Sequence, residues 1–447
     1  MKLSIKSIFL PPSRITPSQG LAIFVLLIWA VYYLVGVENV PFHPDESTQI
    51  FMSHDFDRFA LNSSPILSPD PEIEYHRQLL RMLDAPFTRY LIGFARWIGT
   101  MPATPVDWDW SKSWQENEAA GAIPSNKLLL LSRFSVAILC PFSIFLLYLS
   151  GEKIGGSGLG WLTLILAGMN SLIWLHTRRA MAEGSVFFFS ALALYTIISI
   201  RKRAWFNALS VSLAVNSKQS VLGLVILGLL ALIPNTSGGL SRFRIFCINL
   251  FIYLGILAAV TYWLNPFIHE NPLKAFGQAW NARNDLSRRQ IEEISQIEPG
   301  WVVASPIEKL GGVLVQVFFA PPAISDVNNY DEELLYSKSQ YLNVPLHSLG
   351  NGLFWGSIHL GLVLFGLIIS LRKSFLVDGF NYRILAGGAI IMLIFMAFLL
   401  PPVPYQRYGI VLLPFTTILA AVGIASFYQI WKEARRAITV KKIKSSP

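Results

Sequence analysis

Two adjacent carboxylates, Asp45 and Glu46, follow His43 and Pro44 directly after the first long apolar run of the chain. Pro41 and Pro44 restrict the backbone where it leaves that run, which places both acids near the depth of the lipid headgroups. A carboxylate held there could take a proton from a hydroxyl group as a general base. A solvated acid in an ordinary loop would have no such role, and the residue types alone leave both interpretations open.

The composition indicates that membrane spans position these acids. The 447 residues are 53% hydrophobic and only 14% charged, with a mean hydropathy of +0.48, whereas a soluble domain carries about 25% charged residues. The 13 Trp and 15 Tyr suit the headgroup level at the ends of spans. Cys140 and Cys247 lie in separate apolar runs, so they predict neither a disulfide framework nor a metal site.

About ten apolar runs are long enough to predict an all-α polytopic membrane protein, a single domain over residues 1–447. The predicted spans cover residues 21–37, 128–150, 158–175, 184–200, 206–215, 221–234, 243–264, 350–371, 384–400 and 408–431. The run 206–215 is short and would need flanking residues or a partner helix to cross. The first run has no small-residue cleavage pattern after it, so it is predicted to be an uncleaved span rather than a signal peptide.

The basic residues predict the orientation. With the N-terminus in the cytoplasm and alternating sides, every inner segment is basic, in agreement with the positive-inside rule. The inner basic residues are Lys2, Lys6, Arg14, Lys153, Arg201, Lys202, Arg203, Arg242, Arg244, Arg372, Lys373, Arg383, Lys432, Arg435, Arg436, Lys441, Lys442 and Lys444. Both termini are then cytoplasmic, and the tail 432–447 is a basic segment close to lipid. The net charge of +9 therefore requires no nucleic-acid partner.

Two long outer loops, residues 38–127 and 265–351, are predicted to carry the function, because loops of this length usually do. The first contains an amphipathic stretch, residues 75–98, whose apolar side chains recur at helical spacing and which we expect to lie at the membrane interface. Pro86 is expected to kink or divide this helix. The second loop contains a charged stretch with helical character, residues 273–297.

Short motifs give the chain a resemblance to a known superfamily. The sequence Phe42-His43-Pro44-Asp45-Glu46 after the first span resembles the first outer loop of the GT-C glycosyltransferases, which use lipid-linked sugars. The nearest groups are the protein O-mannosyltransferases and the lipid A aminoarabinose transferases. Further motifs in the expected order are Asp84-Ala85-Pro86-Phe87, Ser132-Arg133-Phe134, Arg178-Arg179-Ala180-Met181-Ala182-Glu183, Asn216-Ser217-Lys218, and Tyr405-Gln406-Arg407-Tyr408 leading to Leu413-Pro414. The first of these lacks the usual His-Pro of the family motif.

This resemblance implies transfer of a sugar from polyprenyl phosphate to an acceptor hydroxyl on the outer face, by a single displacement with inversion. Such a reaction needs one base, and phosphate is already a good leaving group. The resemblance implies Asp45 as that base, with Glu46 positioning it or the acceptor. Outer-end cations would stabilise the departing phosphate, and the candidates are Arg407, Lys218, Arg178 and Arg179. His43, Arg89 and Glu183 are candidates for substrate binding, and Arg133 and Arg89 are further possible partners of the phosphate.

Each of these residues also has a structural interpretation that involves no catalytic or binding role. Each cation could simply extend from a helix end toward the headgroups. Two Asp-x-Asp patterns, Asp55 to Asp57 and Asp107 to Asp109, match a metal motif of nucleotide-sugar transferases, but no nucleotide-binding domain accompanies them. We expect both to be structural. The sequence requires no cofactor. Whether Asp45 or Glu46 binds a divalent metal stays an open question.

Two other functional classes compete with the transferase. The first is a transporter or flippase for a lipid-linked substrate, although its ionisable residues would be expected at mid-membrane depth. The second is a noncatalytic assembly subunit. The lack of added domains favours a prokaryotic plasma membrane, and the acceptor could be a glycolipid, a glycan or a protein.

Overall fold

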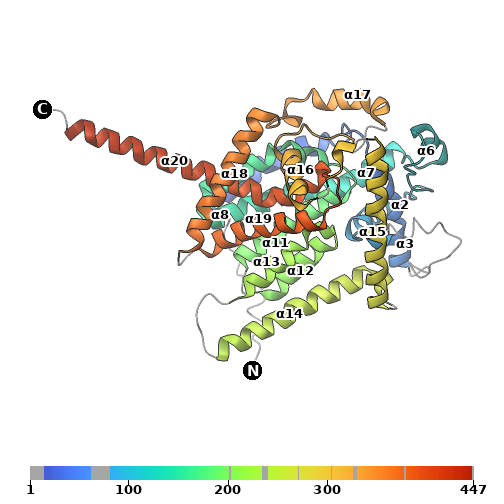
Figure 1. Cartoon of the computed structure of the whole chain (residues 1–447), viewed down its shortest axis with the longest axis horizontal. Helices are drawn as coiled ribbons and strands as arrows, with labels where there is room; N and C mark the ends of the chain where they lie inside the picture. The colour runs from blue at the N-terminus through green and yellow to red at the C-terminus, as the bar shows by residue number, and fades with distance from the viewer. Residues whose placement is uncertain are drawn as a thin grey trace.

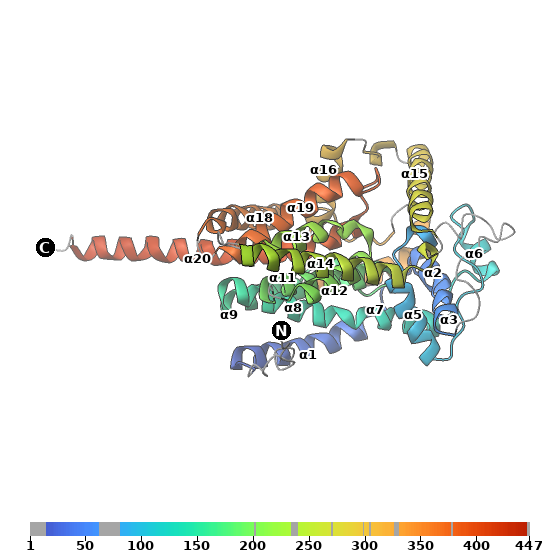
Figure 2. The ribbon, with the colours of Figure 1, turned by 90° about the horizontal axis from the view of Figure 1, so that it is seen from below.

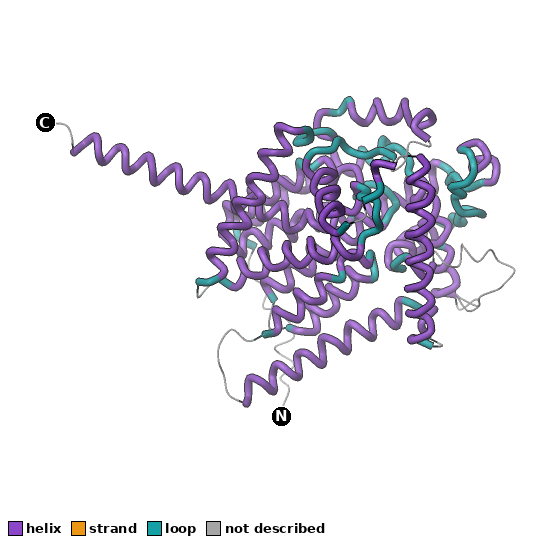
Figure 3. Tube along the Cα trace, viewed as in Figure 1, coloured by secondary structure: helices purple, strands orange, loops and turns teal. Residues whose placement is uncertain are grey.

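The computed structural model describes residues 15–61, 81–200, 203–233, 240–269, 271–297, 299–303, 305–325, 330–376 and 379–444. All regular structure in these ranges is helical (Figure 3). The α-helices are α1 (Pro17–Val35), α2 (Pro44–Met52), α3 (His54–Leu61), α5 (Phe87–Ile98), α6 (Trp114–Ala120), α7 (Asn126–Ala137), α8 (Leu139–Gly155), α9 (Ser157–Gly168), α10 (Ser171–His176), α11 (Ala182–Ser199), α12 (Ala204–Val215), α13 (Gly223–Leu232), α14 (Leu240–Leu264), α15 (Pro272–Ile297), α16 (Pro306–Phe318), α17 (Asp331–Leu342), α18 (Leu353–Ser374), α19 (Phe380–Leu399) and α20 (Leu413–Lys444). Short 3-10 helices are η2 (Gln219–Val221), η3 (Pro266–Ile268), η4 (Pro299–Trp301), η6 (Pro345–His347) and η7 (Gln406–Leu412).

The prediction of an all-α polytopic membrane protein is confirmed. Seven helical segments are long and apolar enough to cross a membrane, namely Pro17–Val35, Asn126–Gly155, Ala182–Ser199, Arg242–Leu264, Leu353–Ser374, Phe380–Leu399 and Gln406–Thr439. Three shorter apolar helices, Ser157–Gly168, Ala204–Val215 and Gln219–Leu232, coincide with the other predicted spans. The count of ten stays a prediction, because these three are shorter than a simple crossing requires. The basic residues Lys2, Lys6, Arg14, Arg201 and Lys202 lie outside the described residues.

Two helix ends differ from the predicted spans because polar side chains cap the helices there. Helix α1 begins at Pro17, four residues before the predicted span, because Thr16 and Gln19 form a reciprocal capping box. The predicted span 158–175 is in fact two helices. Asn170 interrupts it, and its side chain accepts hydrogen bonds from the backbone N–H groups of Leu172 and Ile173 at 3.0 and 3.1 Å, which starts α10.

The helices of the bundle run roughly along one direction, and the functional elements gather at one end. Figure 2 shows the first residues of α1 and the last residues of α20 at the same end, with α2, α3, α5, α6 and α15 at the opposite end. Close contacts between small residues bring spans together. A Cβ at Gly366 would clash with the carbonyl of Leu419, and a Cβ at Gly423 with that of Leu362, so these glycines let α18 and α20 touch.

The helices outside the bundle match the predictions made for the two long loops. Helix α15 spans Pro272–Ile297, one residue longer than predicted, and lies across the direction of the bundle (Figure 1). The amphipathic stretch of the first loop breaks at Pro86, and α5 begins at the next residue, Phe87. Residues 75–80 of that stretch lie outside the described ranges. Leu83 packs against Ala282 and Leu286 of α15, so the two outer loops meet.

Candidate active site

The turn at residues 43–46 is the first turn of α2. His43 caps the helix with its side chain, whose Nδ1 accepts a hydrogen bond of 3.1 Å from the backbone N–H of Asp45. Glu46 reciprocates, since its Oε2 accepts a bond of 3.0 Å from the backbone N–H of His43. Pro44 occupies the first helical position, where its missing N–H is harmless. These local bonds define the start of the helix that carries Asp45.

Glu46 is fully buried and joins four parts of the chain. Arg133 of α7 binds it with two bonds of 2.7 Å, from Nε to Oε1 and from Nη2 to Oε2. The backbone N–H of Ala180 donates to Oε1 at 2.9 Å. Arg133 also donates to the carbonyls of Val37 and Val40, at 3.2 and 2.8 Å. This network ties α2 to the end of the first span, to α7 and to the turn before α11.

The electrostatics of Glu46 favour its charged form. Burial alone would raise the pKa of this carboxyl, but the Arg133 guanidinium, with help from Arg179 and the Ala180 N–H, outweighs burial and holds the pKa below its ordinary value of 4.5. A buried charge of this kind is tolerated only because it is paired and hydrogen-bonded.

We therefore expect a defined pH dependence for a Glu46→Gln variant. The folded-state pKa is lowered, so the charged carboxylate stabilises the fold above pH 4.5, and this contribution is lost as the pH falls below 4.5 through the lowered pKa. Thermal unfolding in detergent should show a constant gap between wild type and variant from about pH 8 to about pH 5, and a shrinking gap below. A gap that vanished already near neutral pH would contradict the assignment.

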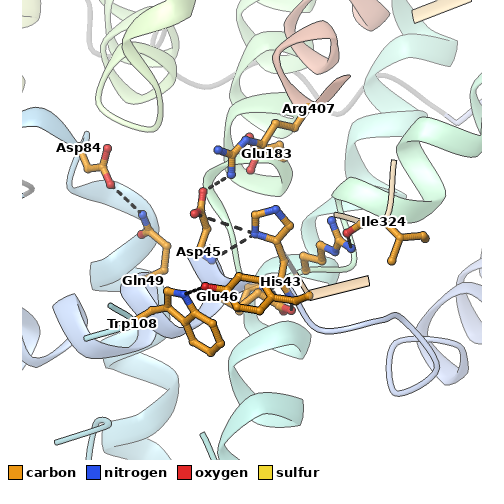
Figure 4. A network of polar contacts seen from close by, with 12 residues as sticks. His43, Asp45, Glu46, Gln49, Asp84, Trp108, Glu183, Ile324 and Arg407 are labelled. Atoms are coloured by element: carbon orange, nitrogen blue, oxygen red, sulfur yellow. Dashed lines mark hydrogen bonds and ion pairs between the residues drawn. The ribbon is translucent and has the colours of Figure 1, made fainter. Parts of the chain in front are cut away.

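Asp45 points away from this buried network. Its side chain is 30% exposed, and its Oδ2 is bound by Nη1 of Arg407, which lies in η7 at the start of the last span. Figure 4 shows the Asp45 carboxylate directed at this guanidinium, with Glu183 behind it. The rings of Tyr405 and Tyr408 lie 5.4 and 5.7 Å from the Arg407 guanidinium carbon and confine it.

A second ion pair stands beside the first. Glu183, in the first turn of α11, is paired with Nζ of Lys218, which follows α12. A carboxylate at a helix N-terminus is favoured by the helix dipole. Lys218 lies 5.0 Å from the centre of the Tyr408 ring, and Arg407 is close enough to act electrostatically on Glu183. Asp45, Glu183, Lys218 and Arg407 are therefore brought together from four separate elements.

Asp84 is a site residue that the sequence analysis quoted within a motif but gave no role. Its Oδ2 accepts a hydrogen bond of 3.4 Å from Nε2 of Gln49, one turn beyond Asp45 on α2 (Figure 4). Burial, and then the negative charge of Asp45, raise the pKa of the Asp84 carboxyl above its ordinary value of 3.8. Its position just before Pro86 was the only signal that pointed to it.

Arg178 and Arg179 have other neighbours. Arg178 donates from Nε to the carbonyl of Tyr33 at 2.9 Å, and its Nη1 lies 3.1 Å from Nε2 of His347. Arg179 donates from Nη2 to the carbonyl of Ile324 at 2.6 Å. Both side chains are 1% exposed, so their partners are built into the fold. Of the four predicted phosphate ligands, the structure pairs Arg407 with Asp45, and it pairs Lys218 with Glu183, on which Arg407 also acts electrostatically.

Arg89 and the Asp-x-Asp patterns also have protein partners. Asp55 is fully buried between Arg81 at 2.9 Å and Arg89 at 3.2 Å, and Asp57 pairs with Arg96 at 2.9 Å. In the second pattern, Asp107 accepts from the N–H of Trp108 at 2.7 Å, and Asp109 accepts from the Ser111 hydroxyl at 2.7 Å. These contacts support the structural interpretation of both patterns.

The described residues do not fit a metal ion. Within those ranges no group of three or more His, Cys, Asp or Glu side chains is placed to hold one. The carboxylates of Asp45 and Glu183 are instead neutralised by Arg407 and Lys218.

Comparison with known proteins identifies the fold. No protein-family model and no curated protein matches the sequence. The solved oligosaccharyltransferase of Archaeoglobus fulgidus, in complex with zinc and sulfate, is similar to 93% of this chain with a TM-score of 0.51 and 13% identity, and the match covers 51% of that protein. The structure of ArnT from Cupriavidus metallidurans is similar to 92% of this chain with a TM-score of 0.50 and 12% identity, over 60% of its length. The matches cover about half to three fifths of each of these proteins, and this chain shares their fold.

Proposed function

We propose that this protein is a glycosyltransferase that moves a sugar from a polyprenyl-phosphate donor to an acceptor hydroxyl on the outer face of a prokaryotic plasma membrane, with both termini in the cytoplasm. The observation that carries the proposal is the meeting of Asp45 with Arg407 beside the Glu183–Lys218 pair. One group able to take a proton thus adjoins two cations able to bind a phosphate. The oligosaccharyltransferase with a similar fold is, by its name, also an enzyme of sugar transfer.

The proposed reaction is a single displacement. The acceptor oxygen attacks the anomeric carbon as its proton passes to the Asp45 carboxylate. The bond from that carbon to the phosphate oxygen breaks, and its electron pair leaves with the polyprenyl phosphate. Arg407 and Lys218 stabilise the negative charge that gathers on the phosphate, and the sugar inverts its configuration because attack and departure occur on opposite faces. Glu46, His43 and Arg133 hold α2, and with it Asp45, in place.

The arrangement of charges favours a transferase over a flippase. The pairs Asp45–Arg407 and Glu183–Lys218 lie at one end of the bundle, where the capped α2 meets α11 and η7. A flippase would be expected to carry ionisable groups along a path through the membrane. A noncatalytic subunit would have no need of an exposed acid facing two cations.

The direct test is mass spectrometry of lipid-linked sugars and of glycans in a deletion strain. The expected result is accumulation of one polyprenyl-phosphate sugar, together with loss of that sugar from one glycan pool. The accumulating lipid then identifies the donor. Unchanged pools of lipid-linked sugars and of glycans would refute sugar transfer.

Replacing Arg407 by Ala is expected to lower the rate of transfer by about 10²-fold or more, because one preorganised donor to the leaving phosphate is removed. The matched control is Arg288→Ala on α15, whose side chain is 72% exposed and pairs only with its neighbour Asp285 at 3.2 Å among the residues described. Steady-state kinetics with membranes should show the loss for the first variant and unchanged rates for the second. Equal rates in both would remove Arg407 from the phosphate site.

A further inference from the structure

A cavity lies beside the segment that leads into the candidate active site. Its volume is about 600 Å³, and it is enclosed by the outer end of α1, by the segment 36–42 and by α17 with η6. The segment 36–42 leads directly into His43, so one wall of the cavity is continuous with the turn that carries Asp45. None of Asp45, Glu183, Lys218 and Arg407 lines it, so it is separate from the proposed phosphate site.

Aromatic side chains form much of this cavity. Phe42 and Trp114 pack edge to face, with ring centres 5.7 Å apart. Behind them Trp108 contacts Trp114 at 5.5 Å and Tyr330 at 5.1 Å, which makes this wall a rigid aromatic cluster. Tyr336 of α17 contributes a ring that is 75% exposed. Aromatic faces carry negative partial charge and attract the polarised C–H groups of a ligand.

Polar groups without competing protein partners interrupt the aromatic surface. Glu38 and Asn39 are exposed at the cavity, and their side chains make no hydrogen bond or ion pair with any residue in the described ranges. Gln340 donates through Nε2 to the Tyr336 hydroxyl at 2.8 Å, which leaves its carbonyl oxygen as an acceptor. A carboxylate and two amides so placed can bond several hydroxyl groups at once.

Arg178 supplies a cation to the same cavity. Its side chain is 1% exposed, and the guanidinium carbon lies 4.4 Å from the centre of the Trp174 ring and 4.7 Å from that of Tyr33. No carboxylate pairs with it among the described residues, and burial lowers the pKa of the guanidinium. Gly36 makes room for it, because a Cβ there would lie 2.6 Å from Nη2.

We propose that this cavity binds a saccharide, the sugar portion of the acceptor. Alternating C–H faces and hydroxyl groups are the chemistry that aromatic rings, carboxylates and amides recognise together. Identifying that saccharide as the acceptor rests on the proposed function; the binding itself does not. Tyr32 and Val35 of α1, the first predicted span, are 51% and 64% exposed and line one side of the cavity. A sugar attached to a membrane lipid would therefore enter from that side.

The test uses the full chain in lipid nanodiscs on a printed array of oligosaccharides. The wild type should retain a defined set of saccharides, and Tyr336→Ala should weaken that retention at least fivefold. Leu335→Ala is the matched control, because it is the adjacent residue of α17, is 64% exposed and does not line the cavity. Both substitutions are at exposed positions, so equal thermal stability of the three proteins is expected and is measured.

Retention of no oligosaccharide by the wild type would overturn the proposal, as would equal weakening of retention by both substitutions.

An Asp45→Asn variant separates this proposal from the proposed function. It should bind the array like the wild type while transferring no sugar, and loss of array binding in this variant would place the saccharide at Asp45 instead. Unchanged transfer by Asp45→Asn would refute the mechanism but leave saccharide binding standing. Tighter binding of the same saccharide on a lipid in the nanodisc than in solution would identify a glycolipid, and equal binding a free glycan.

Discussion

Replacing Asp45 by Asn is expected to lower the rate of sugar transfer by about 10²–10⁴-fold, because the amide has nearly the same shape but takes no proton. Asp45 is 30% exposed and sits beside Arg407, so it is accessible to an acceptor, in contrast to the buried Glu46. The measurement is transfer from polyprenyl-phosphate donors in membranes, normalised to the amount of protein. Membrane levels should be normal, since α2 is capped by His43 and Glu46 rather than by the Asp45 carboxylate.

The matched control for this substitution is Asp109→Asn. Asp109 is also an acid of the first long loop, but it bonds only to Ser111 and Lys112 through its side chain in the described structure. Transfer by this variant should equal that of the wild type. If Asp45→Asn were as active as Asp109→Asn, the assignment of the base would be wrong and the assembly-subunit interpretation would gain support.

Replacing Arg133 by Ala is expected to produce the largest loss of stability. The substitution leaves Glu46 as a buried charge without its main partner, and breaking one side of such a pair typically costs about 3–5 kcal/mol. Thermal unfolding in detergent should show a correspondingly large drop in midpoint. Transfer should fall as well, because α2 loses its anchor to α7 and to the end of the first span.

Lys112→Ala provides the comparison for an exposed pair. Lys112 is 48% exposed and lies 3.3 Å from Asp109, a geometry expected to contribute less than about 1 kcal/mol. The double substitution Glu46→Leu with Arg133→Met should recover much of the stability lost in Arg133→Ala, because it removes the uncompensated charge. A similar midpoint for Arg133→Ala and Lys112→Ala would show that the buried pair does not anchor α2.

Much of the fold could be predicted because the length of each apolar run and the helical spacing of its residues can be read from short stretches of sequence. The charged pattern at residues 273–297 predicted α15 to within one residue, and Pro86 predicted the break before α5. Hydropathy could not predict where a polar side chain caps a helix and so ends an apolar run. Asn170 divides an otherwise continuous apolar run because its short polar side chain competes for backbone N–H groups.

The candidate site was predictable in part, and for a different reason. Asp45 and Arg407 were assigned roles through short motifs in a known order, and the structure brings them into contact. The pairing of Glu46 with Arg133 has no periodic signature, since the two lie on separate helices. Arg178 and Glu183 stand five positions apart in one motif yet have different partners, because the turn between α10 and α11 sends their side chains in different directions.

The contact between Asp45 and Arg407 also has a consequence for biogenesis. The two residues are 362 positions apart in the chain, a separation that a ribosome covers in roughly 20–70 s at about 5–20 residues per second. During that interval α2 can already be docked by Arg133 and Ala180, which are synthesised early, while Asp45 still lacks its partner Arg407. In the proposed mechanism, sugar transfer would therefore become possible only once the last span is inserted, and a nascent or truncated chain would occupy the membrane without consuming lipid-linked sugar.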